Sequence, residues 1–451
     1  SFTSFSRVDK RIHSWEYMKL RNEALANDGI NKVEFPEEVI EKFKNPLHGL
    51  DPSSPDYAQK VIERNYLYCD HYYMEEMFRK YTPQTKANLN ISGGSDRFQY
   101  FLNAGYIHQG GNLKTEPKSK LGYDPSAKMD RWNFRSNFDY EITKSLKSQL
   151  NISTCIQTTN MPGAAPTMYA NDWGWMMRDI FYQAQIMLPI QPGPLTIPGY
   201  GVPAGMMVRP EHMDRTPYEI INRRGARNAT QVDLSAQWAL QWDLSELVTK
   251  GLSIRGQVSY NASGETVHNS DKVEEDYYLK PDYATDSFVY SLHQITPSRL
   301  SVARWYSSLY SINAQAAINY HRVFGKVHDV SAMLLGQRDY WENGGAAIPF
   351  NVIGLSARAT YAYDSRYLAE FNFGYNGSEQ FSPSKRFGFF PAFSFGWVVS
   401  NETFMKNIKW LDNLKLRYSN GKVGNDKIGG ARFLYQDNIQ ISGGGYVGGL
   451  G

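Results

Sequence analysis

The stretch between 156 and 229 holds the residues best suited to recognising a small polar ligand. One short run sets aromatic rings beside amides, an acid and a guanidinium: Tyr169, Asn171, Asp172, Trp173, Trp175, Arg178 and Tyr182. Sugar rings stack their C–H faces on aromatic rings, and their hydroxyls need hydrogen-bonding partners of this kind. The run is therefore a candidate substrate-binding site. The plainer interpretation is that Trp173, Trp175 and Phe181 pack inside the loop, lie at a membrane interface or contact a partner protein.

A second candidate site is an acidic patch. It consists of Asp271, Glu274, Glu275 and Asp276. Carboxylate oxygens are the ligands that calcium prefers, so the patch is a weak candidate for a structural calcium site. The spacing is not that of an EF-hand, and a solvated loop is the plainer interpretation. We expect no other cofactor.

Enzymatic chemistry finds no support in the sequence. The chain lacks the H-E-x-x-H, G-x-S-x-G and Walker A motifs. The glycine-rich stretch from Ser442 to Gly451 has no following Lys-Ser or Lys-Thr, so we interpret it as a loop. Cys69 and Cys155 match neither a metal-site spacing nor a disulfide framework, and their role stays open. We therefore predict a protein that is not an enzyme.

Alternation of apolar and polar residues shows which elements must position these candidates. In 131–141 the aromatic positions are Trp132, Phe134, Phe138 and Tyr140, and the polar ones are Arg131, Asn133, Arg135, Asn137 and Asp139. Successive side chains of a strand point to opposite faces, so this pattern predicts a strand with one apolar and one polar face. A strand that crosses a bilayer needs about 9–11 residues, with apolar side chains toward lipid and polar ones toward the lumen.

The same period recurs along most of the chain. It predicts 12 strands, at 84–92, 97–107, 131–141, 145–156, 230–242, 251–260, 305–320, 327–338, 352–363, 366–375, 387–399 and 414–422. Short connections alternate with long ones. The long connections are 108–130, 156–229, 261–304, 339–351 and 376–386. Outer-membrane barrels have short turns on one side and long extracellular loops on the other. We therefore predict an all-β, antiparallel transmembrane barrel. A soluble β-sandwich or propeller with one wet face is the alternative.

Composition agrees with one large repetitive architecture. The 451 residues include 31 Tyr, 23 Phe and 10 Trp, and no Pro/Ser-rich linker divides them. The net charge is only +3, which gives no electrostatic reason to expect nucleic acid as a partner. No run approaches the 18 or more apolar residues of a membrane-spanning helix.

The polar positions of the predicted strands include seven charged residues that would face the lumen. They are Arg131, Arg135, Asp139, Arg255, Arg358, Glu370 and Arg417. Such residues line a transport route or hold a plug inside the barrel. The plainer interpretation is that any water-filled lumen needs hydrogen-bonding side chains.

Several segments together resemble SusC/RagA-type TonB-dependent transporters. They are Tyr17–Gly29, Leu89–Tyr106, Trp132–Asp139, Tyr363–Phe373, Arg386–Trp397 and Leu414–Asn425, and they occur in the family's order. The first of these resembles a helical insertion in an extracellular loop, and the others resemble successive barrel strands. The run from 363 to 397 contributes most to the resemblance.

The resemblance implies a domain organisation and a cellular location. Residues 1–83 would form an extracellular loop region with a short helix at about 13–28, residues 84–422 consecutive barrel strands, and residues 423–451 the start of a glycine-rich extracellular loop. The family's plug domain and TonB box have no counterpart in these residues. We therefore expect this chain to be a fragment that supplies about 12 strands of a barrel of about 22, located in the bacterial outer membrane.

The resemblance also implies a function and partners. We expect an active importer of a nutrient, chiefly oligosaccharides, energised by the TonB complex through the missing N-terminal part. A SusD-like surface lipoprotein would cover the extracellular loops, and transporter–lipoprotein pairs would dimerise in outer-membrane lipid. The alternatives are an oligopeptide importer of the same family, a passive porin or adhesin barrel, and a soluble β-rich binding protein or glycan-active enzyme.

Overall fold

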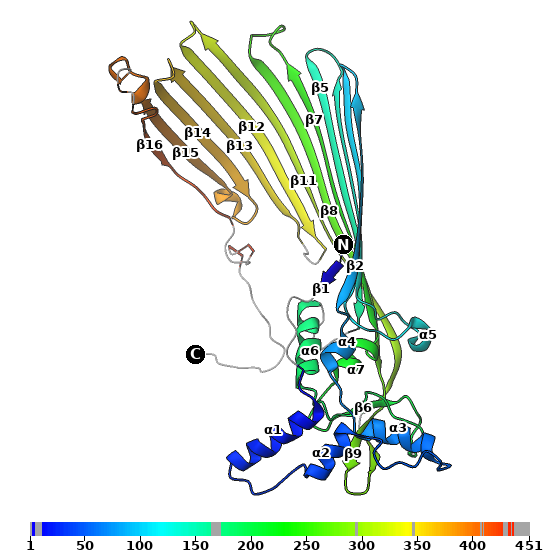
Figure 1. Cartoon of the computed structure of the whole chain (residues 1–451). Coiled ribbons are helices and arrows are strands. Elements are labelled where there is room, and N and C mark those ends of the chain that lie inside the picture. Colours follow the sequence, from blue (N-terminus) through cyan, green and yellow to red (C-terminus); the bar gives the residue numbers. More distant parts are fainter. Residues whose placement is uncertain are drawn as a thin grey trace, which may run out of the picture.

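One antiparallel sheet dominates the molecule. The computed structural model describes residues 2–4, 11–163, 173–293, 296–344, 348–405, 408, 410–426, 432–433 and 435–436. The sheet contains, in spatial order, β1 (Phe2–Ser4), β2 (Tyr81–Gly94), β3 (Phe98–Gly110), β4 (Lys128–Glu141), β5 (Leu146–Pro162), β7 (Ala226–Asp243), β8 (Leu252–Val273), β11 (Ser298–Phe324), β12 (His328–Asn343), β13 (Phe350–Tyr363), β14 (Tyr367–Ser378), β15 (Phe387–Val398) and β16 (Lys415–Gly421). Figure 1 shows these strands side by side in one curved layer, the wall.

All twelve predicted strands are present in the wall, in sequence order. The fold class predicted from alternation, a portion of an antiparallel transmembrane barrel, is therefore confirmed. Several strands are longer than the alternation suggests: β8 has 22 residues and β11 has 27. At about 3.4 Å per residue, β11 is longer than a hydrocarbon core of about 30 Å requires, even when tilted. These strands therefore continue beyond a bilayer.

The connections separate the wall into two unlike ends. Short connections at 95–97, 142–145, 325–327 and 364–366 join strands at the turn end, together with the longer 244–251 and 399–414. The last of these contains the short helices η2 (Val399–Asn401) and η3 (Thr403–Met405). Asp364 and Ser365 both have positive φ, at 48° and 53°, as the tightest hairpin turns require.

Long connections gather at the other end of the wall and form a separate unit, the cap (Figure 1). Its helices are α1 (Ser14–Asn27), α2 (Glu37–Lys44), α3 (Tyr57–Leu67), α4 (Tyr73–Met77), α5 (Lys118–Leu121), α6 (Trp173–Ile186) and α7 (Pro217–Asn222), with η1 (Pro383–Lys385) in a further loop at this end. A small sheet of β10 (Ser287–Leu292), β9 (Asp276–Asp282) and β6 (Met207–Arg209) completes it. No helix in the described part of the chain has the length and apolarity needed to cross a membrane.

The hydrophobic core lies mainly in the cap. One cluster joins α4, α6 and α7 through residues such as Met176, Ile180 and Ile221. A second cluster joins α1, α2, α3 and the small sheet through residues such as Phe43 and Tyr68. The cap therefore folds as a small globular unit attached to the strand ends.

The observed organisation differs from the expected one in two places. The described part of residues 1–83 contains four helices rather than the single helix expected near 13–28, which corresponds to α1. The strands between 84 and 422 are not all consecutive wall strands, since β6, β9 and β10 form their own sheet. Within 423–451, residues 427–431, 434 and 437–451 lie outside the described residues.

Candidate transport surface

The register of the wall gives it one apolar and one polar face. Directly opposed residues of antiparallel strands share a face. One such row is formed by Leu146, Trp242, Ile254, Ile318, Leu334, Ala357 and Phe373. A row of opposite parity is formed by Asn137, Asn151, Gln237, Ser259, Asn313 and Asp339. The alternation seen within single strands is thus matched across six or more neighbouring strands.

Large apolar side chains of the wall lie exposed on the apolar face. Trp132, Phe134 and Trp238 are 45%, 42% and 50% exposed. Phe138 is only partly buried. A dry protein interior does not surround these side chains, as it would in a soluble sandwich. An apolar surface of this extent requires a hydrocarbon environment.

All seven charged residues predicted for the lumen lie on the polar face. Arg358 and Glu370 form a two-pronged ion pair across β13 and β14, with N···O distances of 3.0 and 3.1 Å. Arg255 donates to three glutamines, among them Gln149 at 3.3 Å and Gln257 at 3.2 Å. Arg255, Arg358 and Glu370 therefore take part in a hydrogen-bonded lining rather than pointing singly into solvent.

The polar face carries several hollows. One of about 510 Å³ is lined by side chains that include Asn103, Arg135, Ser153, Asp233 and Asn261. Another of about 310 Å³ lies between Glu370, Lys415 and Arg417. Amides, hydroxyls and paired charges supply both donors and acceptors in these hollows, which suits a ligand with many hydrogen-bonding groups.

A larger hollow, of about 580 Å³, lies where β2–β5 meet the cap. Its lining includes the cations Arg79, Lys80 and Lys128 and the amides Asn112 and Asn160. Lys128 is held by Asp124 at 2.7 Å, whereas Arg79 forms no ion pair with any described residue. These residues could not be predicted from the alternation because they lie at strand ends, outside the alternating segments. Their only local signal is a pair of adjacent cations just before a strand.

The predicted substrate run falls at helix α6. Tyr169, Asn171 and Asp172 lie outside the described residues, and α6 begins at Trp173. Further along α6, Ile180 is fully buried in the cap core, and Phe181 stacks on Phe78 with ring centroids 4.5 Å apart.

Two residues of α6 lie on its exposed side. Arg178 is exposed and Tyr182 is 57% exposed. They are four residues apart and therefore neighbours on one helix face. The structure thus places Arg178 and Tyr182 on the solvent-exposed side of α6 in the cap.

Three of the four acids of the candidate calcium site have separate partners, and Asp271 Oδ1 is buried without a hydrogen-bond partner among the described residues. Glu274 pairs with Arg223 at 3.2 Å and with Lys272, and Tyr277 donates its hydroxyl to Glu275. Asp276 accepts from Arg209 at 2.5 Å and lies 2.8 Å from His293 Nδ1. Over the described ranges, no three acidic, histidine or cysteine side chains are grouped as a metal site would need. The expected calcium site is therefore not formed in this structure.

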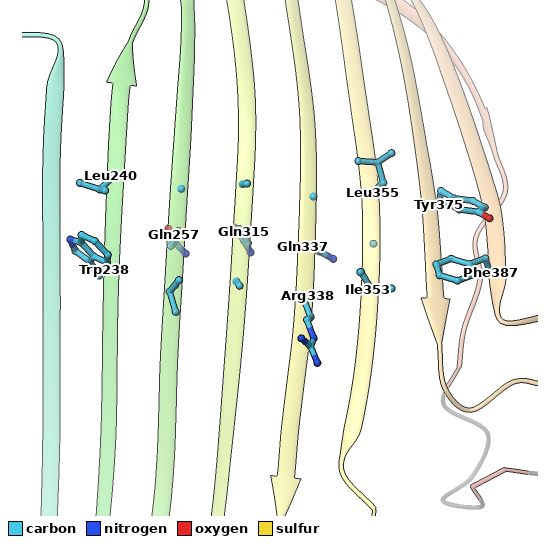
Figure 2. A pocket seen from close by; sticks show the side chains of 16 residues that line it. Trp238, Leu240, Gln257, Gln315, Gln337, Arg338, Ile353, Leu355, Tyr375 and Phe387 are labelled. Carbon is cyan, nitrogen blue, oxygen red and sulfur yellow. The ribbon is translucent and has the colours of Figure 1, made fainter. Parts of the chain in front are cut away.

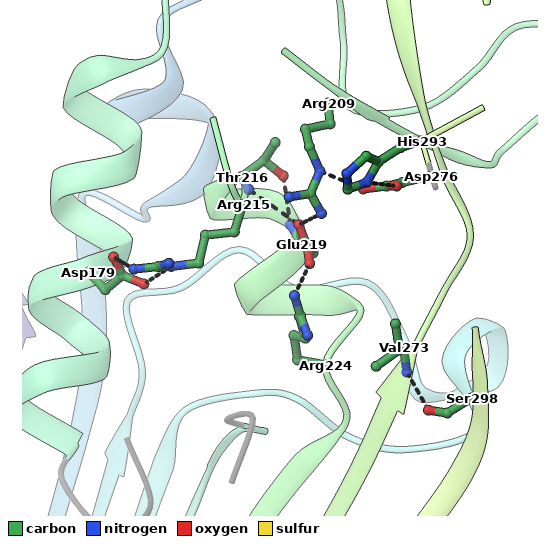
Figure 3. A network of polar contacts seen from close by, with 10 residues as sticks. All are labelled: Asp179, Arg209, Arg215, Thr216, Glu219, Arg224, Val273, Asp276, His293 and Ser298. Carbon is green, nitrogen blue, oxygen red and sulfur yellow. Dashed lines mark hydrogen bonds and ion pairs between the residues drawn. The ribbon is translucent and has the colours of Figure 1, made fainter. Parts of the chain in front are cut away.

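Asp276 instead belongs to a buried polar network that fastens the cap together (Figure 3). Arg209 of β6 joins Asp276 of β9 to Glu219 of α7, and all three are at least 95% buried. Glu219 also completes a capping box with Thr216 and accepts an ion pair from Arg224. The motif Thr216-Pro217-Tyr218-Glu219 is a helix-start signal that was visible in the sequence.

Asp286 is a second charged hub of the cap. Its carboxylate accepts from Lys42 and Arg64, each at 2.8 Å, and from the Tyr68 hydroxyl. Burial alone would raise the pKa of Asp286, but the hydrogen bonds from Lys42 and Tyr68 and the charge of Arg64 outweigh it and lower that pKa. The loop before β10 is thereby fixed to α2 and α3.

Comparison with known proteins gives relatives of one kind. TonB-dependent receptor P39 of Formosa agariphila is 23% identical over 415 residues, which is 86% of this chain and 35% of that protein. TonB-dependent receptor SusC of Bacteroides thetaiotaomicron is 36% identical over 78 residues, or 17% of this chain and 8% of SusC. The chain thus spans about a third of the first of these relatives. No family model matches the chain.

The fold has a counterpart among solved structures. The structure of the RagAB peptide transporter superposes with a TM-score of 0.60 at 15% identity, covering 95% of this chain and 46% of the matched chain. The closed-closed state of the RagAB peptide importer gives a TM-score of 0.56 over 93% of this chain. The fold of the wall and the cap is therefore already seen in a solved structure.

Proposed function

We propose that this chain, which belongs to the SusC/RagA-type TonB-dependent outer-membrane transporters, forms the substrate-facing wall and cap of a nutrient importer. The continuous two-faced sheet carries the proposal. Its apolar face suits lipid, and its polar face, lined with amides, hydroxyls and paired charges, suits a hydrated route through the barrel. The chain is not an enzyme, and its contribution is to bind, orient and admit the substrate.

The proposed substrates are oligosaccharides. Stacking rings beside amides and carboxylates suit pyranose faces and hydroxyls, and the run that ends in α6 has this composition. The hollow beside Asn112 and Asn160 lies at the cap end of the polar face, where a substrate released from the cap would first meet the wall. An oligopeptide would use the same amides and cations, so it is the competing substrate in any test.

The proposed partners follow from the two ends of the wall. The cap would face the cell exterior and receive a SusD-like lipoprotein as a lid. The TonB complex would act from the turn end, through parts of the complete protein beyond this chain. Transporter–lipoprotein pairs are proposed to form dimers. In this scheme the wall stays rigid, because its strands are continuously hydrogen-bonded, and gating takes place elsewhere.

The proposal is tested by replacing both Trp173 and Trp175 with Ala in the complete transporter. Loss of two stacking rings is expected to weaken substrate capture by roughly tenfold or more. The measurement is uptake of a labelled oligosaccharide by cells, with a labelled oligopeptide in parallel. A matched control is Trp410→Ala, since Trp410 is 83% exposed in the 399–414 connection at the turn end.

Each outcome of that test has a definite meaning. Reduced oligosaccharide uptake with normal barrel assembly supports the site on α6. Unchanged uptake of both compounds removes α6 from the substrate site. Reduced peptide uptake with unchanged sugar uptake replaces the proposed substrate class with oligopeptides.

A further inference from the structure

The apolar face of the wall has a groove that is lined by residues of seven neighbouring strands. It has a volume of about 660 Å³, within the range of small-molecule sites. Its floor is formed by the small residues Gly256, Ala314, Ala316 and Gly336 of β8, β11 and β12. Trp238 and Leu240 of β7 form one side, and Ile353, Leu355, Tyr375 and Phe387 of β13–β15 form the other (Figure 2).

The groove exists because of side-chain size and not because of backbone geometry. A Cβ at Gly256 would meet no atom within 4 Å, and one at Gly336 would approach only the Ala316 carbonyl oxygen, at 4.0 Å. Neither glycine has a positive φ. Larger residues would therefore fit these positions without strain and would fill the groove. The backbone fold therefore does not require small residues at these positions.

A lone cation lies at the cap-side edge of this groove. By register Arg338 lies on the apolar face, directly opposite Ala314 and Ile353. Its Nε donates to Asn351 Oδ1 at 3.1 Å, and no carboxylate of the described residues lies within ion-pair distance. An arginine on a lipid-facing strand is strongly unfavourable near the bilayer centre and nearly neutral at the interface.

The surroundings place Arg338 just inside the membrane interface. Two residues further along β12, Tyr340 and Tyr310 of the neighbouring strand both donate their hydroxyls to Glu342, at 3.0 and 2.7 Å. Tyrosines of this kind mark the headgroup level of a barrel. Figure 2 shows the Arg338 side chain running along β12 toward its C-terminal end, which is the cap end. At that level the guanidinium would reach the lipid phosphate groups, with the groove beneath it in hydrocarbon.

We propose that this groove binds one anionic, phosphate-bearing lipid of the cap-side leaflet. An acyl chain lies along Gly256, Ala316 and Gly336 between the aromatic sides, and the lipid phosphate accepts hydrogen bonds from Arg338. A guanidinium group binds phosphate through two parallel N–H···O hydrogen bonds. The opposite charges of the two groups make these hydrogen bonds stronger than neutral ones. Charge complementarity favours this occupant over an apolar transmembrane segment, which would leave Arg338 without a counter-ion. The proposal rests on the membrane placement of the wall and not on the transported substrate.

The test measures lipid retained by the complete transporter. The protein is exchanged into nanodiscs of phosphatidylcholine containing phosphatidylglycerol, extracted into mild detergent, and weighed by native mass spectrometry. Wild-type protein is expected to retain one phosphatidylglycerol. Arg338→Gln is expected to lower that retention about tenfold, as loss of a charge-assisted hydrogen bond predicts. Gly256→Leu with Gly336→Leu is expected to lower retention of both lipids.

A matched control separates this site from general charge effects. Arg322 also lies on the apolar face of the wall, beside Phe324 at the turn end and away from the groove. Arg322→Gln is expected to retain phosphatidylglycerol as wild type does. Equal retention by wild type and Arg338→Gln would overturn the proposal. So would lipid-free dimers that dissociate when the groove is filled, because the occupant would then be a second copy of the chain.

Discussion

The wall and the cap place similar apolar side chains in opposite surroundings. In the cap, Ile180 and Ile221 are fully buried and Arg209 is 3% exposed, because side chains there must be sheltered from water or paired. In the wall, Phe134 and Trp238 are about half exposed, and the opposite face is polar. The comparison shows that the exposed apolar side chains of the wall indicate a face that contacts lipid rather than water. The wall is built for lipid on one side and water on the other, and the cap for water all round.

A large effect is expected from placing a charge on the lipid face. Phe134→Arg is expected to destabilise the membrane-inserted barrel by about 2–4 kcal/mol, because a guanidinium near the bilayer centre loses its hydration. Asn133→Arg, the adjacent residue on the polar face, is expected to change stability by under about 1 kcal/mol. The measurement is urea-induced unfolding of the complete protein in lipid vesicles. Equal effects at both positions would break the distinction between the faces.

A comparable effect is expected in the cap from removing a buried cation. Arg209→Ala leaves Asp276 and Glu219 buried without their shared partner, which is expected to destabilise the cap by about 3–5 kcal/mol. Hydrogen exchange is the suitable measurement, since it reports the cap amides separately from the wall. The control is Lys280→Ala, whose exposed pair with Glu211 at 3.3 Å is worth about 0–1 kcal/mol. Loss of protection in the wall instead would contradict the independence of the two regions.

The smallest effect concerns the pH dependence of cap stability. Because the folded-state pKa of Asp286 is lowered, its contribution to stability is complete above the ordinary value of 3.8 and is lost as pH falls through the lower, folded-state pKa. Cap protection should therefore decrease on acidification below about pH 4. Asp286→Asn should remove part of this dependence, the rest coming from carboxylates such as Asp70 and Glu116, whose pKa values are also lowered by ion pairs and hydrogen bonds. An unchanged acid profile in Asp286→Asn would show that other carboxylates dominate.

Sequence reasoning succeeded in the wall because its determinants are local. Successive side chains of a wall strand face lipid and water in turn, which gives the sequence a period of two. Strands such as β4 and β14 could therefore be located from their own residues. The same alternation predicted that the strand beginning at 251 ends at 260, whereas β8 continues to Val273. Beyond the bilayer the outer side chains no longer need to be apolar, so the period fades while hydrogen bonding continues.

The cap could not be predicted in the same way, because distant residues decide it. Helices α2 and α3 are short, and Lys42 and Arg64 are held by Asp286, more than 200 residues away in the chain. Likewise, the acids near 274–276 resembled a metal site until their partners Arg223 and Arg209 were known. Composition suggested a substrate site near Trp173, and whether α6 serves that purpose remains a prediction.

The most direct test of the two-faced wall is the solvent that each successive residue of one strand contacts. Spin labels placed singly on cysteines at 132–137, in the complete protein with Cys69 and Cys155 replaced by Ser, would report collision with oxygen in lipid and with a water-soluble nickel complex. Labels at 132, 134 and 136 are expected to favour oxygen, and labels at 133, 135 and 137 the nickel complex. Uniform contact with water along the whole strand would contradict the assignment of this sheet to a membrane barrel.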